Sequence, residues 1–164
     1  MNTDQFWNLI ESARTISSSC SGMAQRLKEY FVEMSADEIY GFQQELWQRL
    51  DESYRWDLWA VAFIIDGGCS DDGFEYFRGW LISQGRKYFE AALADPRQAA
   101  ERAQPDAIYC EDILYVAGIA YKAKTGKHLT RSAGRTQKSP AGTLWEEDKV
   151  NDLYPDLAER FSGK

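Results

Sequence analysis

Residues 54–80 read YRWDLWAVAFIIDGGCSDDGFEYFRGW, and this stretch decides the fold class. Its first part, residues 56–65, is apolar on nearly every side, too short to cross a membrane and without the strict alternation of a half-exposed strand. These features predict a buried central helix. Gly67 and Gly68 are expected to end it, because glycine adopts the conformation of a helix C-terminus at little steric cost.

A second helix is predicted directly after this turn. Ser70 can act as its N-cap, and Asp71, Asp72 and Glu75 place negative charge in its first turn, where the helix dipole favours it. Its inward face is formed by Phe74, Phe77 and Leu81. The stretch therefore predicts two packed helices joined by a short, polar, glycine-containing turn.

The flanking sequence shows the same helical period. Helices are expected over residues 4–16 behind Thr3 as N-cap, over 23–34, over 36–54 behind a Ser35/Glu38 capping box, over 86–94 and over 106–124, and Pro155 can occupy the first turn of a further short helix in the C-terminal segment. No stretch alternates like a strand. We therefore predict a compact, single-domain, all-α bundle of six to seven helices, with a helical core over residues 1–126, a basic exposed loop over 127–143, and a C-terminal segment over 144–164 that packs back on the core.

Composition and charge exclude several classes of function. With 164 residues, 44% of them hydrophobic and 27% charged, the chain has the composition of one folded domain. The net charge of −7 argues against nucleic acid or an anionic membrane as a partner and favours a basic protein surface. The start MNTDQFWN has no signal-peptide pattern. We expect a soluble, cytoplasmic protein.

The charge is unevenly distributed. Residues 122–140 hold six basic residues and no acidic one, which leaves −13 on the rest of the chain. The six are Lys122, Lys124, Lys127, Arg131, Arg135 and Lys138. Such a cluster can be a nucleic-acid patch, but no aromatic residues are interleaved with it. A solvated loop, or a loop that folds onto the protein's own acidic body, is the better interpretation.

The three cysteines, Cys20, Cys69 and Cys110, form no C-x-x-C pair. An odd number without that spacing argues against a disulfide framework and against a thiolate zinc site. The prediction is three reduced thiols.

The turn of residues 67–75 carries the candidate binding residues. They are Asp66, Cys69, Ser70, Asp71, Asp72 and Glu75, together with Arg78 and Asp57 among the neighbouring aromatic residues. Converging carboxylates could hold Mg²⁺ or Ca²⁺, but adjacent aspartates point apart on a helix and the spacing is not that of a known calcium loop. Helix termination and capping is the simpler interpretation, and no metal ligand is assigned.

Cys69 precedes a helix N-terminus, an environment that can activate a thiol. A Cys–His pair would need His128, the only histidine, and nothing in the sequence brings the two together. A buried structural cysteine is therefore favoured. The turn also lacks the Gly-x-Ser-x-Gly pattern of a serine hydrolase. No catalytic residue and no cofactor is assigned.

Six aromatic residues surround the turn and could line a pocket, although helical spacing favours a core. They are Trp56, Trp59, Phe63, Phe74, Phe77 and Trp80. Arg55, Asp57 and Arg78 lie among them. A buried Arg–Asp pair is one explanation of these charges and an anion or carboxylate pocket is the other.

The stretch resembles the core of the family of domain of unknown function 4240, which is mainly bacterial. The Gly-Gly-Cys-Ser-Asp-Asp-x-Phe motif at residues 67–74 carries the resemblance. Three further elements extend it: Phe6, Trp7 and Ile10; residues 89–93 before Asp95 and Pro96; and Trp145, Glu146 and Glu147 with the later Pro155 and Leu157. The resemblance implies a compact helical domain and no assigned activity or catalytic residues.

Two functions stay open on this basis. The leading hypothesis is a non-enzymatic, acidic binding protein that engages a basic protein partner, such as an immunity protein that inhibits a toxin. The alternative is an enzyme or a small-ligand or metal-binding protein whose site is the turn of residues 67–75. The sequence does not determine the oligomeric state.

Overall fold

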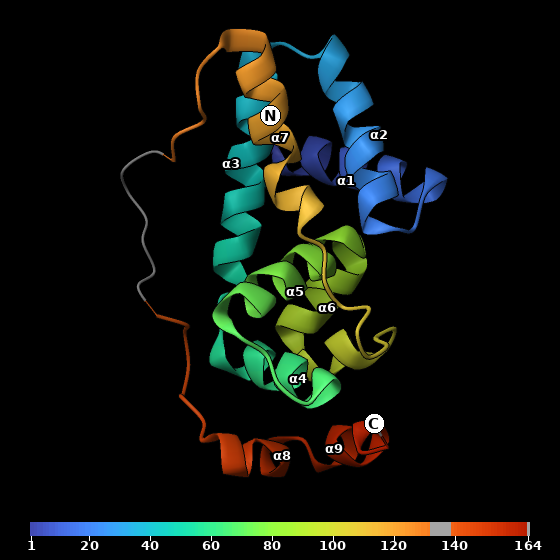
Figure 1. Cartoon of the computed structure of the whole chain (residues 1–164), viewed down its shortest axis with the longest axis vertical. Helices are drawn as coiled ribbons and strands as arrows, with labels where there is room; N and C mark the ends of the chain where they lie inside the picture. The colour runs from blue at the N-terminus through green and yellow to red at the C-terminus, as the bar shows by residue number, and fades with distance from the viewer. Residues whose placement is uncertain (132–138, 164) are drawn as a thin grey trace.

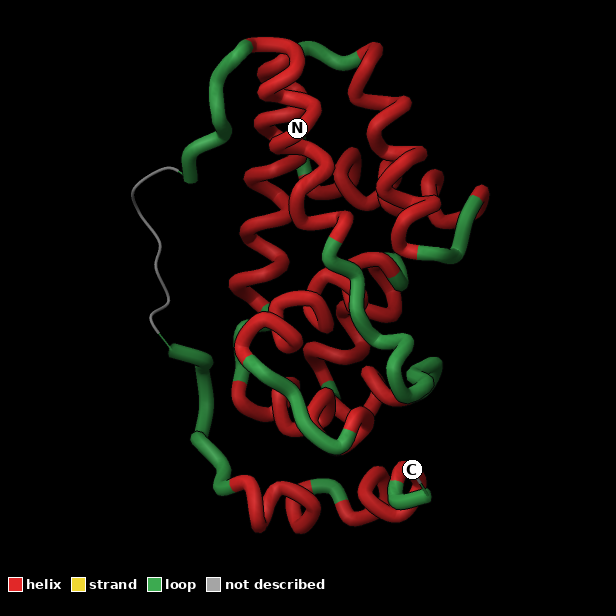
Figure 2. The backbone as a smooth tube through the Cα atoms, in the orientation of Figure 1, coloured by secondary structure: helices red, strands yellow, loops and turns green. Residues whose placement is uncertain are grey.

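The computed structural model describes residues 1–131 and 139–163, and helices joined by loops make up this part of the chain, without strands (Figures 1 and 2). It contains α1 (Thr3–Ile16), α2 (Cys20–Glu33), α3 (Ala36–Glu52), α4 (Trp56–Asp66), α5 (Asp71–Ser83), α6 (Arg86–Ala94), α7 (Asp112–Thr125), α8 (Val150–Leu153) and α9 (Pro155–Phe161), with 3₁₀ turns at Pro96–Ala100 and Glu147–Lys149. The all-α prediction is confirmed. The predicted number of helices is too low, since the described residues form nine.

The helices are arranged as two groups along the long axis of the molecule (Figure 1). Helices α1, α2, α3 and α7 pack together in the upper part, and α4, α5 and α6 lie below them. Helices α8 and α9 run along the bottom and pack on α4. Among the described residues no helix is long and apolar enough to span a membrane.

Side-chain caps fix where several helices begin. Ser35 and Glu38 form the predicted capping box, and Ser70 accepts a hydrogen bond from the Gly73 N–H at 3.1 Å. At α1 the predicted cap is wrong by one residue. Asn2, rather than Thr3, accepts from the N–H of the third helical residue, and Thr3 is the first residue of the helix.

Helix α4 is the central element of the lower group. Seven of its eleven residues are buried, which confirms the predicted buried helix, and Gly67 ends it in the left-handed conformation with φ of 71°. Its aromatic neighbours Phe74 and Phe77 are fully buried, whereas Trp56 and Phe63 are half-buried. Those two half-buried rings lie under the C-terminal segment.

Trp145 attaches that segment to α4. Its ring centroid lies 5.2 Å from that of Phe63 and 6.1 Å from that of Trp56, and its indole N–H donates to the Trp56 carbonyl at 2.7 Å. Ala141 forms an isolated parallel bridge with Arg55. These contacts bring the C-terminal segment back to α4. Arg135 and Lys138 of the predicted basic loop lie outside the described residues.

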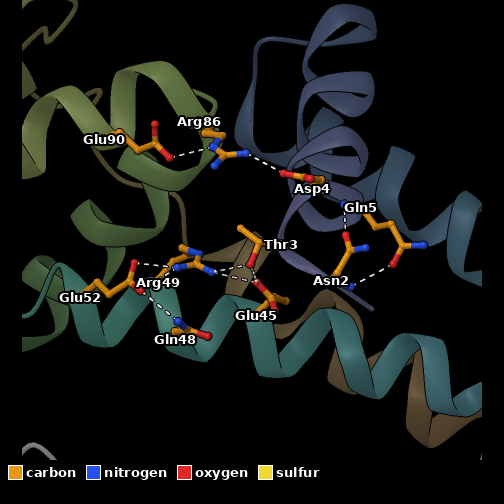
Figure 3. Close-up of polar contacts among 10 residues, drawn as sticks. All are labelled: Asn2, Thr3, Asp4, Gln5, Glu45, Gln48, Arg49, Glu52, Arg86 and Glu90. Carbon is orange, nitrogen blue, oxygen red and sulfur yellow. Dashed lines mark hydrogen bonds and ion pairs between the residues drawn. The ribbon is translucent and has the colours of Figure 1, made fainter.

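An almost fully buried arginine joins α3 to α1 (Figure 3). Arg49, 7% exposed, donates to Glu45 at 2.8 Å and to Glu52 at 2.6 Å. Thr3 donates to the same Glu45 carboxylate at 3.0 Å. A buried charge is tolerated when it is paired and hydrogen-bonded in this way. This network is therefore structural.

Two of the three cysteines form a disulfide. Cys20 at the start of α2 is bonded to Cys110, just before α7, across a sequence separation of 90 residues. The prediction of reduced thiols is therefore wrong for this pair, and only Cys69 is free. Sequence spacing gave no signal because the helix packing, and not a local motif, brings the two sulfur atoms together.

Helix α7 begins at Asp112, six residues later than predicted. The preceding residues are held in a non-helical conformation by tertiary hydrogen bonds. The Asp106 N–H donates to Asp66 at 2.9 Å, and the Cys110 N–H donates to the Tyr76 carbonyl at 2.9 Å. Asp106 itself has a φ of 61°, which is incompatible with a continuous right-handed helix.

Candidate functional site

The structure divides the predicted site residues among three places. Asp66, Cys69, Ser70, Asp71 and Asp72 lie at the α4–α5 turn. Glu75 and Arg78, one and two turns further along α5, line a cleft against α3 and α7. Asp57 lies at the start of α4. The eight residues therefore do not form one site.

At the α4–α5 turn, Asp66 joins two segments that are far apart in the sequence. Its carboxylate accepts from the Asp106 N–H at 2.9 Å and from the Tyr109 hydroxyl. Burial and this carboxylate raise the pKa of Tyr109 above its ordinary value, so that the phenol stays protonated. Asp66 therefore positions the segment that precedes α7.

Cys69 lies half-buried in the same turn. Burial, followed by the nearby charge of Asp66, raises the pKa of the thiol to about 12. A thiol with this pKa is almost entirely protonated at neutral pH, so it is a poor nucleophile. The Cys69 carbonyl accepts from the Trp59 indole N–H at 2.9 Å. The structural interpretation of this residue is favoured over the catalytic one.

The exposed carboxylates of the turn lie beside those of a second segment. Asp71 and Asp72 occupy the first turn of α5, and Tyr109 lies against that turn, with a ring carbon 3.8 Å from the Cβ position of Gly73. Glu111 accepts from the Tyr76 hydroxyl at 3.1 Å. We call Asp71, Asp72, Asp106 and Glu111, all exposed, the acidic surface.

Metal binding at this surface finds no geometric support. In residues 1–131 and 139–163, no group of three or more His, Cys, Asp or Glu side chains converges as a metal site requires. Asp71 and Asp72 are adjacent on one helix, so their carboxylates diverge. Ser70 is used as the N-cap of α5.

Asp57 belongs to a local ion pair. Arg55 donates to its carboxylate from two nitrogens and, through Nη1, to the Leu93 carbonyl at 2.7 Å. Of the two explanations that the sequence left open for these charges, the structure favours the Arg–Asp pair over an anion pocket here. Arg78 does not take part in it.

Arg78 instead lies in the cleft between α3, α5 and α7. Its Nη1 donates to the Leu50 carbonyl at 2.8 Å. Its guanidinium stacks on two rings, with Cζ 4.7 Å from the ring centroid of Tyr54 and 5.0 Å from that of Phe74. Burial lowers the pKa of Arg78 from its ordinary high value, which leaves the side chain charged. The cleft has a volume of about 680 Å³.

The family of the chain is shown by its sequence match. Residues 1–123 match the model of the family described as Protein of unknown function (DUF4240). The chain belongs to this family. The match covers α1 to α6 and nearly all of α7, which include the acidic surface and three walls of the cleft. No curated protein and no solved structure matches the chain. Membership of DUF4240 brings no activity with it, so function must be argued from the side chains.

Several residues of the α4–α5 turn region and of the cleft could not be predicted, or were not predicted, from the sequence. Tyr109 and Asp106 were assigned to a helix, and nothing local showed that they would face Asp66. Gln43 was missed although a signal existed. It lies four residues after Ile39 and three before Leu46, on the buried stripe of its helix, where a polar side chain is unexpected.

Proposed function

We propose that this DUF4240 protein is a non-enzymatic binding protein whose acidic surface engages a basic protein partner. The observation that carries the proposal is the grouping of four exposed carboxylates on two adjoining segments: Asp71 and Asp72 in the first turn of α5, and Asp106 and Glu111 in the segment that Asp66 and Tyr76 hold against it. The pKa of Tyr76 agrees with this grouping: its hydrogen bond to Glu111, followed by burial, raises it to about 12, and the charges of Glu111 and Asp72 contribute.

A concentration of exposed negative charge supports binding through electrostatic steering. Complementary charge raises the association rate with a basic protein, and this gain falls as salt screens the charges. The net charge of −7 acts in the same direction at longer range. We propose that inhibition of a basic enzyme, as by an immunity protein that neutralises a toxin, is the form this binding takes.

The experiment is affinity capture with the tagged full-length protein in its own host at low and high salt, with mass spectrometry of the retained proteins. The test variant is Asp71→Asn with Asp72→Asn. The matched control is Glu33→Gln with Asp37→Asn, which removes two exposed charges at the α2–α3 link, at the top of Figure 1 and away from the α4–α5 turn.

The proposal expects one basic partner that is retained at low salt by the wild type and the control, and that is lost at high salt and with the test variant. A capture without any basic protein would contradict it. So would a partner that both double variants retain equally, since the acidic surface would then take no part.

The cytoplasmic location stays a prediction, and the Cys20–Cys110 disulfide weighs against it because disulfides persist mainly in oxidising compartments. Trapping of free thiols in living host cells, followed by mass spectrometry, would decide. A protein carrying three alkylated cysteines fits a reducing cytoplasm. One alkylated cysteine, Cys69, fits an oxidising compartment.

A further inference from the structure

The cleft between α3, α5 and α7 is separate from the acidic surface and contains a different kind of chemistry. Residues from all three helices, and His128 from the segment after α7, line its volume of about 680 Å³. This lies within the range of roughly 300–1,000 Å³ that small-molecule sites occupy. In Figure 1, α7 runs beside α3 above α5, which agrees with the packing of these helices against one another.

Gln43 is the observation that points to a ligand. Its side chain is 97% buried, being only 3% exposed, and it lines the cleft. Within residues 1–131 and 139–163 its carboxamide makes no hydrogen bond, and neither of its polar atoms is among the fully buried side-chain atoms without a partner. The amide is therefore open to the cleft, where a ligand can reach it. A carboxamide carries a donor and an acceptor side by side, so it suits a ligand edge that offers the complementary pair.

Arg78 supplies a fixed positive charge. The Leu50 carbonyl and two aromatic rings hold its guanidinium in place, while its Nη2 makes no hydrogen bond within the described part of the chain. Lys122 adds a second cation on α7. Counting all charged side chains of the lining, three basic residues face two acidic ones, so the cleft has a local charge of +1 in a protein of −7. This balance favours an anionic ligand.

Aromatic side chains complete the wall. Trp47 on α3 is half-buried and Tyr115 on α7 is 50% exposed, and both line the cleft. The guanidinium of Arg131 already lies over the Trp47 ring, 5.7 Å from its centroid. Aromatic rings bind planar groups by stacking, so the exposed ring of Tyr115 is the candidate stacking face beside the amide and the cations.

We propose that this cleft binds a nucleotide, with Gln43 on the hydrogen-bonding edge of the base and Arg78 and Lys122 on the phosphate. Glutamine pairs through two hydrogen bonds with an adenine edge, and guanidinium groups bind phosphate oxygens in the same paired manner. The site does not depend on the proposed protein partner, since it lies on other helix faces than the acidic surface.

The test is calorimetric titration of the full-length protein with AMP, and with adenosine and inorganic phosphate as separate probes. AMP is expected to bind at concentrations up to about 1 mM, and each of the two fragments at least about tenfold more weakly, because each makes only part of the contacts. Phosphate that binds as tightly as AMP would overturn the proposal, and so would adenosine that does. Absence of AMP binding also overturns it.

Gln43→Leu is the decisive variant. It keeps the approximate shape of the side chain and removes the amide, which makes no hydrogen bond within the described residues, so we expect a fold of about wild-type stability, with AMP affinity reduced at least about fivefold. Gln44→Leu is the matched control, because Gln44 is the exposed neighbour on the same helix and should leave affinity unchanged. Lys122→Gln, at an exposed position, should also weaken AMP and leave adenosine unaffected. Equal AMP affinity in Gln43→Leu and Gln44→Leu would overturn the assignment.

Discussion

Gly79 on α5 faces the backbone carbonyl of Cys110, and a Cβ atom at Gly79 would lie 2.4 Å from that oxygen. Only a residue without a side chain allows the segment before α7 to pack this closely on α5. The same contact fixes Cys110 opposite Cys20 and places Tyr109 and Glu111 at the acidic surface. One glycine thus links the fold to the candidate site.

Gly79→Ala is expected to destabilise the protein. The added methyl group must displace backbone, which costs about 1–3 kcal/mol, and the helix-propensity gain of about 1 kcal/mol offsets only part of this, so a net loss of up to about 2 kcal/mol is expected. Gly118→Ala is the matched control on α7, because no atom lies within 4 Å of its Cβ position, and it should be neutral or stabilising. Urea unfolding measures both. Equal stability of the two variants would show that the close approach is not rigid.

The Cys20–Cys110 disulfide is expected to contribute about 2–5 kcal/mol to the free energy of unfolding, since it closes a long loop in the unfolded chain. The double variant Cys20→Ala with Cys110→Ala should lose this contribution. The same unfolding experiment with and without reductant provides the control. Reductant should lower the stability of the wild type and leave the double variant unchanged, and a wild type that is insensitive to reductant would argue against the bond.

The free thiol of Cys69 is expected to be unreactive in the native protein. Its pKa of about 12 leaves a minute thiolate fraction at pH 8, and the thiolate is the form that reacts. Titration with a disulfide reagent should show slow modification in the native state and fast modification in guanidinium chloride. Rapid native modification at pH 8 would restore Cys69 as a candidate nucleophile.

The stability of the folded protein is expected to depend on pH through Glu38, and the capping role of this residue fixes the sign of the dependence. Hydrogen bonds from the backbone N–H and hydroxyl of Ser35 are the main causes that lower the pKa of this carboxyl below its ordinary value. Its ionised form therefore stabilises the folded state above the pKa of the unfolded chain, and this contribution is lost as the pH falls through the folded-state pKa. Glu38→Gln keeps the capping geometry without the charge.

Wild type should accordingly exceed Glu38→Gln in stability at pH 7, and the difference should shrink at acid pH. NMR titration of the carboxyl carbon gives the pKa directly. Glu33→Gln, which removes an exposed carboxylate outside the capping box, is the matched control for the loss of one negative charge. A Glu38 pKa at or above its ordinary value would contradict the capping interpretation.

Local patterns in the sequence determined the helices and many of their ends. The Ser35/Glu38 box, Ser70 and Gly67 act through hydrogen bonds and backbone conformations within a few residues, so each could be assigned without knowledge of the fold. The apolar run of residues 58–65 determined a buried helix for the same reason. The resemblance to the DUF4240 family is confirmed by the family match over residues 1–123.

Only the tertiary structure decided which residues meet. Cys20 is bonded to Cys110, Asp66 accepts from Tyr109, and Gln43 and Arg78 line the same cleft, although the members of each pair come from different segments. No periodicity encodes such pairs. The structure also separated candidate residues that are neighbours in the sequence, because successive positions on α5 point to different sides. Asp71 and Asp72 face solvent at the acidic surface, whereas Glu75 and Arg78 face the cleft. Side-chain packing between helices makes that choice, and it depends on contacts that a single chain segment does not contain.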